Sequence, residues 1–141
     1  MRQLQQSPRH RRGQALVEFA LVMPLLLLFL VGIIEFGRGW NSHQVITDAA
    51  REAARKCVIA DSKVTQDTVV NVAKSAMAAA GINTAPASVS VTGFARPNPT
   101  GLPCTVAIQL PYTFTFLGPM MSWTTGQRSI TLTSSFSMRN E

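Results

Sequence analysis

Residues 13–34 read Gly13-Gln-Ala-Leu-Val-Glu-Phe-Ala-Leu-Val-Met-Pro-Leu-Leu-Leu-Leu-Phe-Leu-Val-Gly-Ile-Ile34, and Glu18 is their one charged residue. The 20 residues 15–34 form a helix of about 30 Å, which matches the hydrocarbon core of a bilayer. The stretch therefore predicts a transmembrane helix, with expected bounds of 14–40. Pro24 predicts a kink within it.

The segment before this stretch, residues 1–13, is basic. It contains Arg2, Arg9, Arg11 and Arg12 and no acid, and we expect an unstructured leader. An excess of Arg beside an apolar run places that side in the cytoplasm, so the C-terminal domain is expected to be periplasmic or otherwise extracytoplasmic. The run lacks the small-residue cleavage site of a secretory signal peptide, which favours a retained single-pass membrane helix.

The formal net charge of +6 comes largely from this leader. After Gly13 the chain holds nine Lys and Arg against seven acids, a balance of +2. These basic residues are scattered and do not alternate with aromatic residues, as a nucleic-acid-binding groove requires. No nucleic-acid partner is expected.

The helical pattern continues beyond Trp40 to about residue 58. Apolar residues recur there every three to four positions, and most are Ala, so a sheet can approach this face closely. A second helix is expected over about 66–80, because Thr65 is a suitable N-cap and Gly81 a suitable stop.

Three segments alternate apolar residues with Ser, Thr or other polar residues: about 87–94, 104–116 and 129–139. This period of two predicts an antiparallel sheet with one covered face. The Ala-rich half of the first helix, with the second helix beside it, is expected to cover that face. The predicted fold class is α+β, with an outer domain over 41–141.

Residues 117–128 place apolar side chains in a loop broken by Gly and Pro. Two interpretations remain open for this segment. It either caps the open end of the sheet or forms a contact surface for a partner subunit or the outer membrane leaflet.

Cys57 and Cys104 are the two cysteines of the chain, and they match no metal-ligand spacing. In an exported domain they are expected to form a disulfide. The alternative is two buried thiols that act as small hydrophobic residues.

No set of catalytic residues can be assembled, because the chain has no zinc-protease, phosphate-loop, dinucleotide-binding or nucleophile-elbow motif. His43, Asp48 and Glu52 suggest a metal site only weakly, since a charged solvent-facing helix surface explains them more simply. We expect no enzyme activity, no metal and no cofactor.

Glu18 is harder to explain as part of a simple anchor, because an acid within a membrane segment is costly without a partner. One interpretation is that it reaches the headgroups. The other is that cleavage after Gly13 creates an α-amino group on Gln14, which pairs with Glu18 of a neighbouring molecule and fixes the stagger. At the outer end of the helix, Glu35 and Arg38 are spaced i,i+3 and are expected to form an interfacial ion pair.

These residues also carry a family resemblance. Gly13 followed by Gln-Ala-Leu-Val-Glu18-Phe19 resembles the processing site of prepilins of the type IV filament superfamily. Residues 12–28, Glu35-Phe-Gly-Arg38 and the Ala-Ala-Arg-Glu-Ala-Ala-Arg stretch at 49–55 resemble the TadE-like pseudopilins, or minor pilins, of its Tad (tight adherence, Flp) branch. The resemblance is specific over residues 12–58 and looser beyond them.

The resemblance implies a structural subunit that supports Flp pilus biogenesis, adhesion and biofilm formation. It implies cleavage between Gly13 and Gln14 by a membrane prepilin peptidase, and a role for Glu18 and Phe19 in assembly. The implied partners are that peptidase, other Tad pilins and pseudopilins, the inner-membrane assembly platform and the lipid bilayer. The implied location is the bacterial inner membrane.

Two other functions remain open. The chain is alternatively an uncleaved single-pass anchor whose outer domain binds a cell-envelope partner. A small membrane-tethered enzyme is a weaker third hypothesis.

Overall fold

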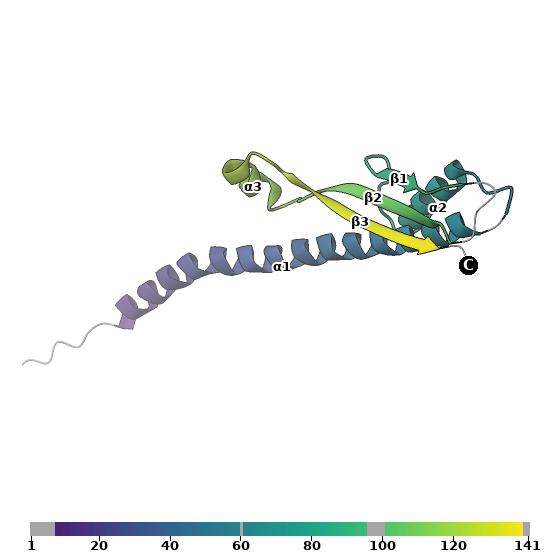
Figure 1. Ribbon diagram of the computed structural model, residues 1–141. Coiled ribbons are helices and arrows are strands. Elements are labelled where there is room, and N and C mark those ends of the chain that lie inside the picture. Colours follow the sequence, from purple (N-terminus) through teal and green to yellow (C-terminus); the bar gives the residue numbers. More distant parts are fainter. Residues whose placement is uncertain (1–7, 60, 96–100, 140–141) are drawn as a thin grey trace, which may run out of the picture.

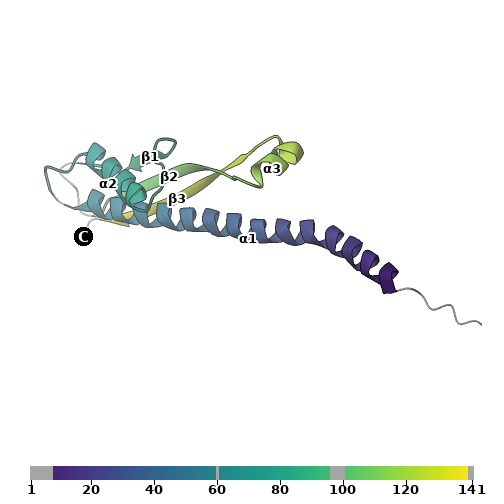
Figure 2. The same ribbon diagram turned by 180° about the vertical axis from the view of Figure 1, so that it is seen from behind.

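The computed structural model describes residues 8–59, 61–95 and 101–139. Its main element is one long helix, along which the other elements are arranged. Helix α1 (Pro8–Val58) has 51 residues and is therefore roughly 77 Å long. Helix α2 and most of the sheet lie beside its C-terminal half, and α3 lies beside its middle (Figure 1). The helix bends within its N-terminal part, which contains Pro24, as expected where a proline removes a backbone hydrogen bond (Figures 1 and 2).

The start of α1 corrects one expectation, because residues 8–13 were expected to be unstructured and are helical. Proline is favoured at the first helical position, where its missing N–H costs nothing. The Arg and His residues that follow Pro8 have ordinary helix propensity and extend the apolar helix backwards. Residues 1–7 of the expected leader lie outside the described residues.

The C-terminal half of α1 supplies one wall of the core. Its fully buried stripe repeats every three to four residues and consists of Ile46, Ala49, Ala50, Ala53, Ala54 and Cys57. In the N-terminal half, by contrast, the apolar side chains are exposed and the most apolar window is 0% buried. The change from exposed to buried separates a membrane-type segment from a domain-type segment of the same helix.

Helix α2 (Gln66–Ala79) packs against α1 through Val69, Ala73 and Met77. Its N-terminus has a capping box, in which the Thr65 hydroxyl accepts the Thr68 N–H at 3.2 Å. Such a cap satisfies backbone donors that the first turn leaves without partners.

The sheet has three antiparallel strands in the order β1-β2-β3. They are β1 (Ser88–Thr92), β2 (Pro103–Thr113) and β3 (Ser129–Arg139). Cys104, Val106, Ile108 and Leu110 of β2 face the helices and are buried, whereas the residues between them are more exposed. The α+β class and the covered antiparallel sheet predicted from the sequence are confirmed.

Helix α3 (Gly118–Thr125) corrects a second expectation, because residues 117–128 were expected to form a loop. Pro119 lies in its first turn, where proline is favoured, and Gly126 ends it with a left-handed φ of 72°. The Gly and Pro residues therefore bound a short helix. In Figure 1, α3 is at the end of the sheet nearest the middle of α1.

Candidate functional site

The residues proposed for processing and assembly lie on the exposed, apolar half of α1. Gly13, Gln14, Glu18 and Phe19 are all exposed, and Phe19 is 61% accessible. A Cβ placed on Gly13 would meet no atom within 4 Å. This end of the helix is thus open to another molecule.

Glu18 accepts a hydrogen bond from the Gln14 side-chain amide, which donates to its carboxylate at 3.1 Å. Among the residues whose side chains the structure describes, no cationic nitrogen lies within 4.0 Å of Glu18. The carboxylate therefore retains room for a positive group from outside the chain.

Glu35 is fully buried, and its carboxylate binds the backbone of residues 115–117. One carboxylate oxygen accepts the Thr115 N–H at 2.7 Å, and the other accepts the N–H groups of Phe116 and Leu117, both at 2.8 Å. The ion pair with Arg38 expected from the i,i+3 spacing is not formed among the described residues. A buried carboxylate that accepts several backbone N–H bonds is satisfied without a countercharge.

The three donors belong to the segment between β2 and α3, where the sheet ladder has ended. The Phe114 N–H still donates to the Arg128 carbonyl at 3.2 Å, but the next three residues turn away from β3. Leu117 is the N-cap of α3, and the N-terminus of a helix favours a negative charge. Glu35 thus ties the start of α3 to α1.

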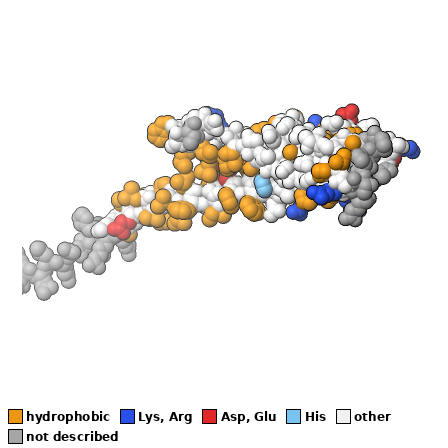
Figure 3. Space-filling model, viewed as in Figure 1, with side chains coloured by type: hydrophobic (Ala, Val, Ile, Leu, Met, Phe, Trp, Pro, Cys, Tyr) orange, Lys and Arg blue, Asp and Glu red, His pale blue; other side chains and the backbone are white. Residues whose placement is uncertain are grey.

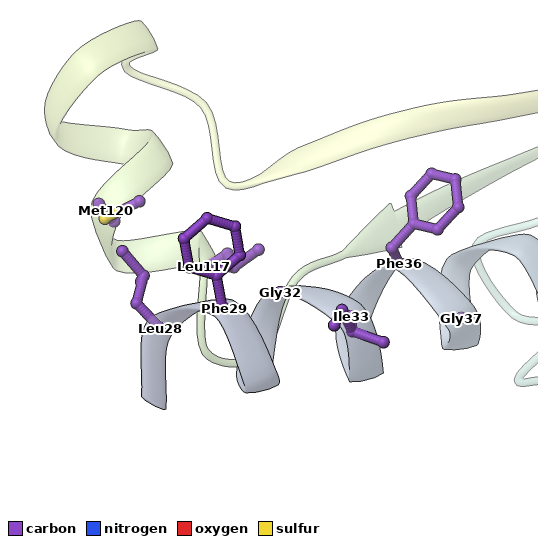
Figure 4. Close-up of a pocket in the computed structure, with 8 residues that line it drawn as sticks. All are labelled: Leu28, Phe29, Gly32, Ile33, Phe36, Gly37, Leu117 and Met120. Atoms are coloured by element: carbon purple, nitrogen blue, oxygen red, sulfur yellow. The ribbon is translucent and has the colours of Figure 1, made fainter. Parts of the chain in front are cut away.

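An apolar groove of about 570 Å³ lies between α1 and the start of α3. Figure 4 shows Leu117 and Met120 directed toward Phe29 and Leu28 of α1. The residues that line the groove are Leu28, Phe29, Gly32, Ile33, Phe36, Gly37, Leu117 and Met120.

The surface around this groove is apolar as well. Trp123 of α3 is 90% exposed and Phe116, just before α3, is 65% exposed. In Figure 3 hydrophobic side chains cover both the N-terminal half of α1 and the end of the molecule that carries α3, whereas Lys and Arg gather at the opposite end. In this view the apolar side chains thus gather around α3 and the N-terminal half of α1, and most of the Lys and Arg side chains lie away from them.

The structure brings Cys57 and Cys104 together in a disulfide, with their Cα atoms 6.3 Å apart. Both residues are buried, and the bond joins the end of α1 to the start of β2. It lies at the end of the domain farthest from α3.

The structure does not bring His43, Asp48 and Glu52 together. Asp48 pairs with Arg51 at 3.6 Å on the exposed face of α1, and Arg51 also lies 5.4 Å over the Phe136 ring. Within the described residues, no group of three or more His, Cys, Asp or Glu side chains is placed to hold a metal ion.

Residues 13–55 match a family model described as TadE-like protein. No curated protein and no solved structure matches the chain. The matched segment begins at the proposed cleavage site and ends near the last turn of α1, so it includes Glu18, Phe19 and Glu35. Over these residues the chain is similar to the TadE-like proteins, which confirms the resemblance to this family read from the sequence.

Proposed function

We propose that this protein is a pseudopilin, or minor pilin, of a Tad-type pilus assembly and secretion system. It acts as a structural subunit in Flp pilus biogenesis, and through the pilus in adhesion and biofilm formation. The TadE-like match over residues 13–55 supports this function, as does the layout of a long apolar helix that continues into a small α+β domain.

The observation that carries the proposal is the exposed carboxylate of Glu18 on a helix half whose apolar side chains are exposed. Such a surface is unfavourable in water and is matched to lipid or to other apolar helices. Within a helix assembly the acid needs a positive partner at its own depth.

Cleavage after Gly13 would supply that partner as the α-amino group of Gln14. Because Gln14 and Glu18 are four residues apart, they are separated by about 6 Å along the helix axis. A neighbouring subunit shifted by about one helical turn brings its amino group level with Glu18. Other registers leave both charges without a partner, so the pair selects the stagger.

N-terminal sequencing of the protein from cells with and without the prepilin peptidase tests the cleavage step. The mature chain is expected to start at Gln14 in the first cells and at Met1 in the second. A Gly13→Val variant should stay uncut. Gly37→Val is its matched control, because Gly37 also has no atom within 4 Å of an added Cβ, and it should be processed normally.

The rival function is an uncleaved anchor whose outer domain binds a cell-envelope partner. Two observations favour it: α1 runs through Gly13 without interruption, and Glu18 already accepts a hydrogen bond from the Gln14 side chain. A chain that still begins at Met1 in cells with the peptidase would support this rival and overturn the pilin proposal.

A further inference from the structure

Helix α3 lies at the depth of the membrane-spanning part of α1. The apolar run of α1 ends at Ile34, and the groove toward α3 reaches down to Leu28. Six residues of helix correspond to about 9 Å. Leu117 and Met120 therefore face a level of α1 that lies inside the hydrocarbon layer once α1 spans a bilayer.

The composition of this segment matches such an environment. From Phe114 to Gln127 there is no charged residue, and Arg128 is the first charge that follows. Met120 is 48% exposed and Trp123 is 90% exposed. Exposing these apolar side chains to water is unfavourable. Trp is instead typical of the region where the hydrocarbon layer meets the headgroups.

Glu35 explains how polar backbone is tolerated near the membrane. The N–H groups of Thr115, Phe116 and Leu117 would lack partners in a lipid layer, and such donors are costly there. The Glu35 carboxylate accepts all three. The clamp also holds α3 beside the outer end of the spanning helix.

From these observations we propose that α3 inserts into the outer leaflet beside α1 and that the α1–α3 groove holds an acyl chain of a leaflet lipid. The occupant is lipid because the groove walls are apolar and continuous with the lipid-facing surface of α1. The chain then has two membrane contacts, one spanning helix and one interfacial helix. The proposal requires only that α1 spans a membrane, so it does not depend on the pilus function.

Tryptophan fluorescence of the full chain in phosphatidylcholine vesicles tests this placement. The chain has two Trp residues, so Trp40→Phe leaves Trp123 as the only reporter, and Trp123→Phe leaves Trp40 as the matched control. Vesicles with bromine atoms on the acyl chains quench Trp within the hydrocarbon, and iodide quenches Trp in water.

We expect Trp123 to lose most of its emission in brominated vesicles, to lose more than Trp40 does, and to be protected from iodide. Trp40 lies six residues beyond Ile34 and should be less affected by bromine. If iodide quenches Trp123 and bromine does not, α3 lies in water and the proposal fails. If neither quencher reaches Trp123, protein covers α3, and the assignment of lipid as the occupant is overturned.

A second test introduces a charged side chain into the α1–α3 groove of the Trp40→Phe variant. Met120→Lys should sharply reduce bromine quenching of Trp123. Thr133→Lys, at an exposed position of β3, is the control and should leave the quenching unchanged. Unchanged quenching in Met120→Lys would show that the groove is not the lipid site.

Discussion

Glu35 joins parts of the chain that lie 80 to 82 residues apart, through three hydrogen bonds to backbone N–H groups. Both carboxylate oxygens take part, and the side chain is fully buried. Replacing it therefore leaves three backbone donors without the acceptor that they share. The Glu35 clamp is the residue-scale feature on which the position of α3 depends.

Glu35→Gln should weaken this clamp, because an amide presents a donor where the carboxylate presents an oxygen. We expect a loss of about 1.5–3 kcal/mol in the local free energy of opening, the range for hydrogen bonds to a charged group. Hydrogen–deuterium exchange should accelerate at the amides of 115–117. Glu52→Gln, on the exposed face of α1, is the matched control, and equal exchange in both variants would refute the clamp.

A second residue-scale prediction concerns Glu18. Glu18→Leu keeps the helix apolar and removes the charge proposed to select the stagger. We expect cleavage after Gly13 to continue while assembly is lost, seen as a large drop in surface pili by electron microscopy. Glu52→Leu controls for loss of an acid elsewhere on α1. Normal piliation of the Glu18 variant would exclude its role in register.

The sequence pointed to both Glu18 and Glu35, but for Glu35 it suggested only Arg38 as a partner. The i,i+3 spacing drew attention to Arg38, which is local, whereas the true partners are backbone groups of a distant loop. Backbone donors leave no signature in side-chain patterns. The available signal was the position of this acid directly after the apolar run that ends at Ile34, where a charge needs a partner.

At the scale of elements, the helices and strands that the sequence predicted are those whose hydrophobic pattern repeats with a clear period. The Ala stripe of α1 and alternate residues of β2 are buried, and in β3 half-buried residues alternate with exposed ones. Helix α3 has no such contrast, because its eight residues are apolar or small on all sides. Its form depends on the position of its ends, which the Glu35 clamp and Gly126 fix.

The disulfide joins α1 to β2 across a sequence separation of 47 residues. Removing it tests how much it stabilises the packing of these two elements. Replacing both cysteines by Ala should lower the free energy of unfolding by about 4 kcal/mol, the value for a closed loop of this length in the chain-entropy model. Urea unfolding followed by circular dichroism measures the change. Wild-type protein with reductant should shift similarly, and an unchanged midpoint in both cases would contradict the prediction.

At the scale of the whole molecule, the described apolar core lies entirely between Ile46 and Leu110. The first half of α1 contributes exposed apolar surface and no buried apolar side chain to the domain. Folding of the outer domain and insertion of the helix are therefore separable. Glu35 is the one buried residue that lies before the core, so it alone connects the two parts through a buried contact among the described residues.

This separation predicts the behaviour of two fragments in water. Residues 41–141 should fold cooperatively with the disulfide intact, because every described apolar core residue is present. Residues 33–141 should fold equally well and also retain Glu35. Hydrogen exchange in α2 and the sheet should then be the same in both fragments, whereas the amides of 115–117 should exchange faster in the shorter one. If the shorter fragment fails to fold, the first half of α1 contributes to the domain core; if the loop amides behave alike, Glu35 does not hold the two parts together.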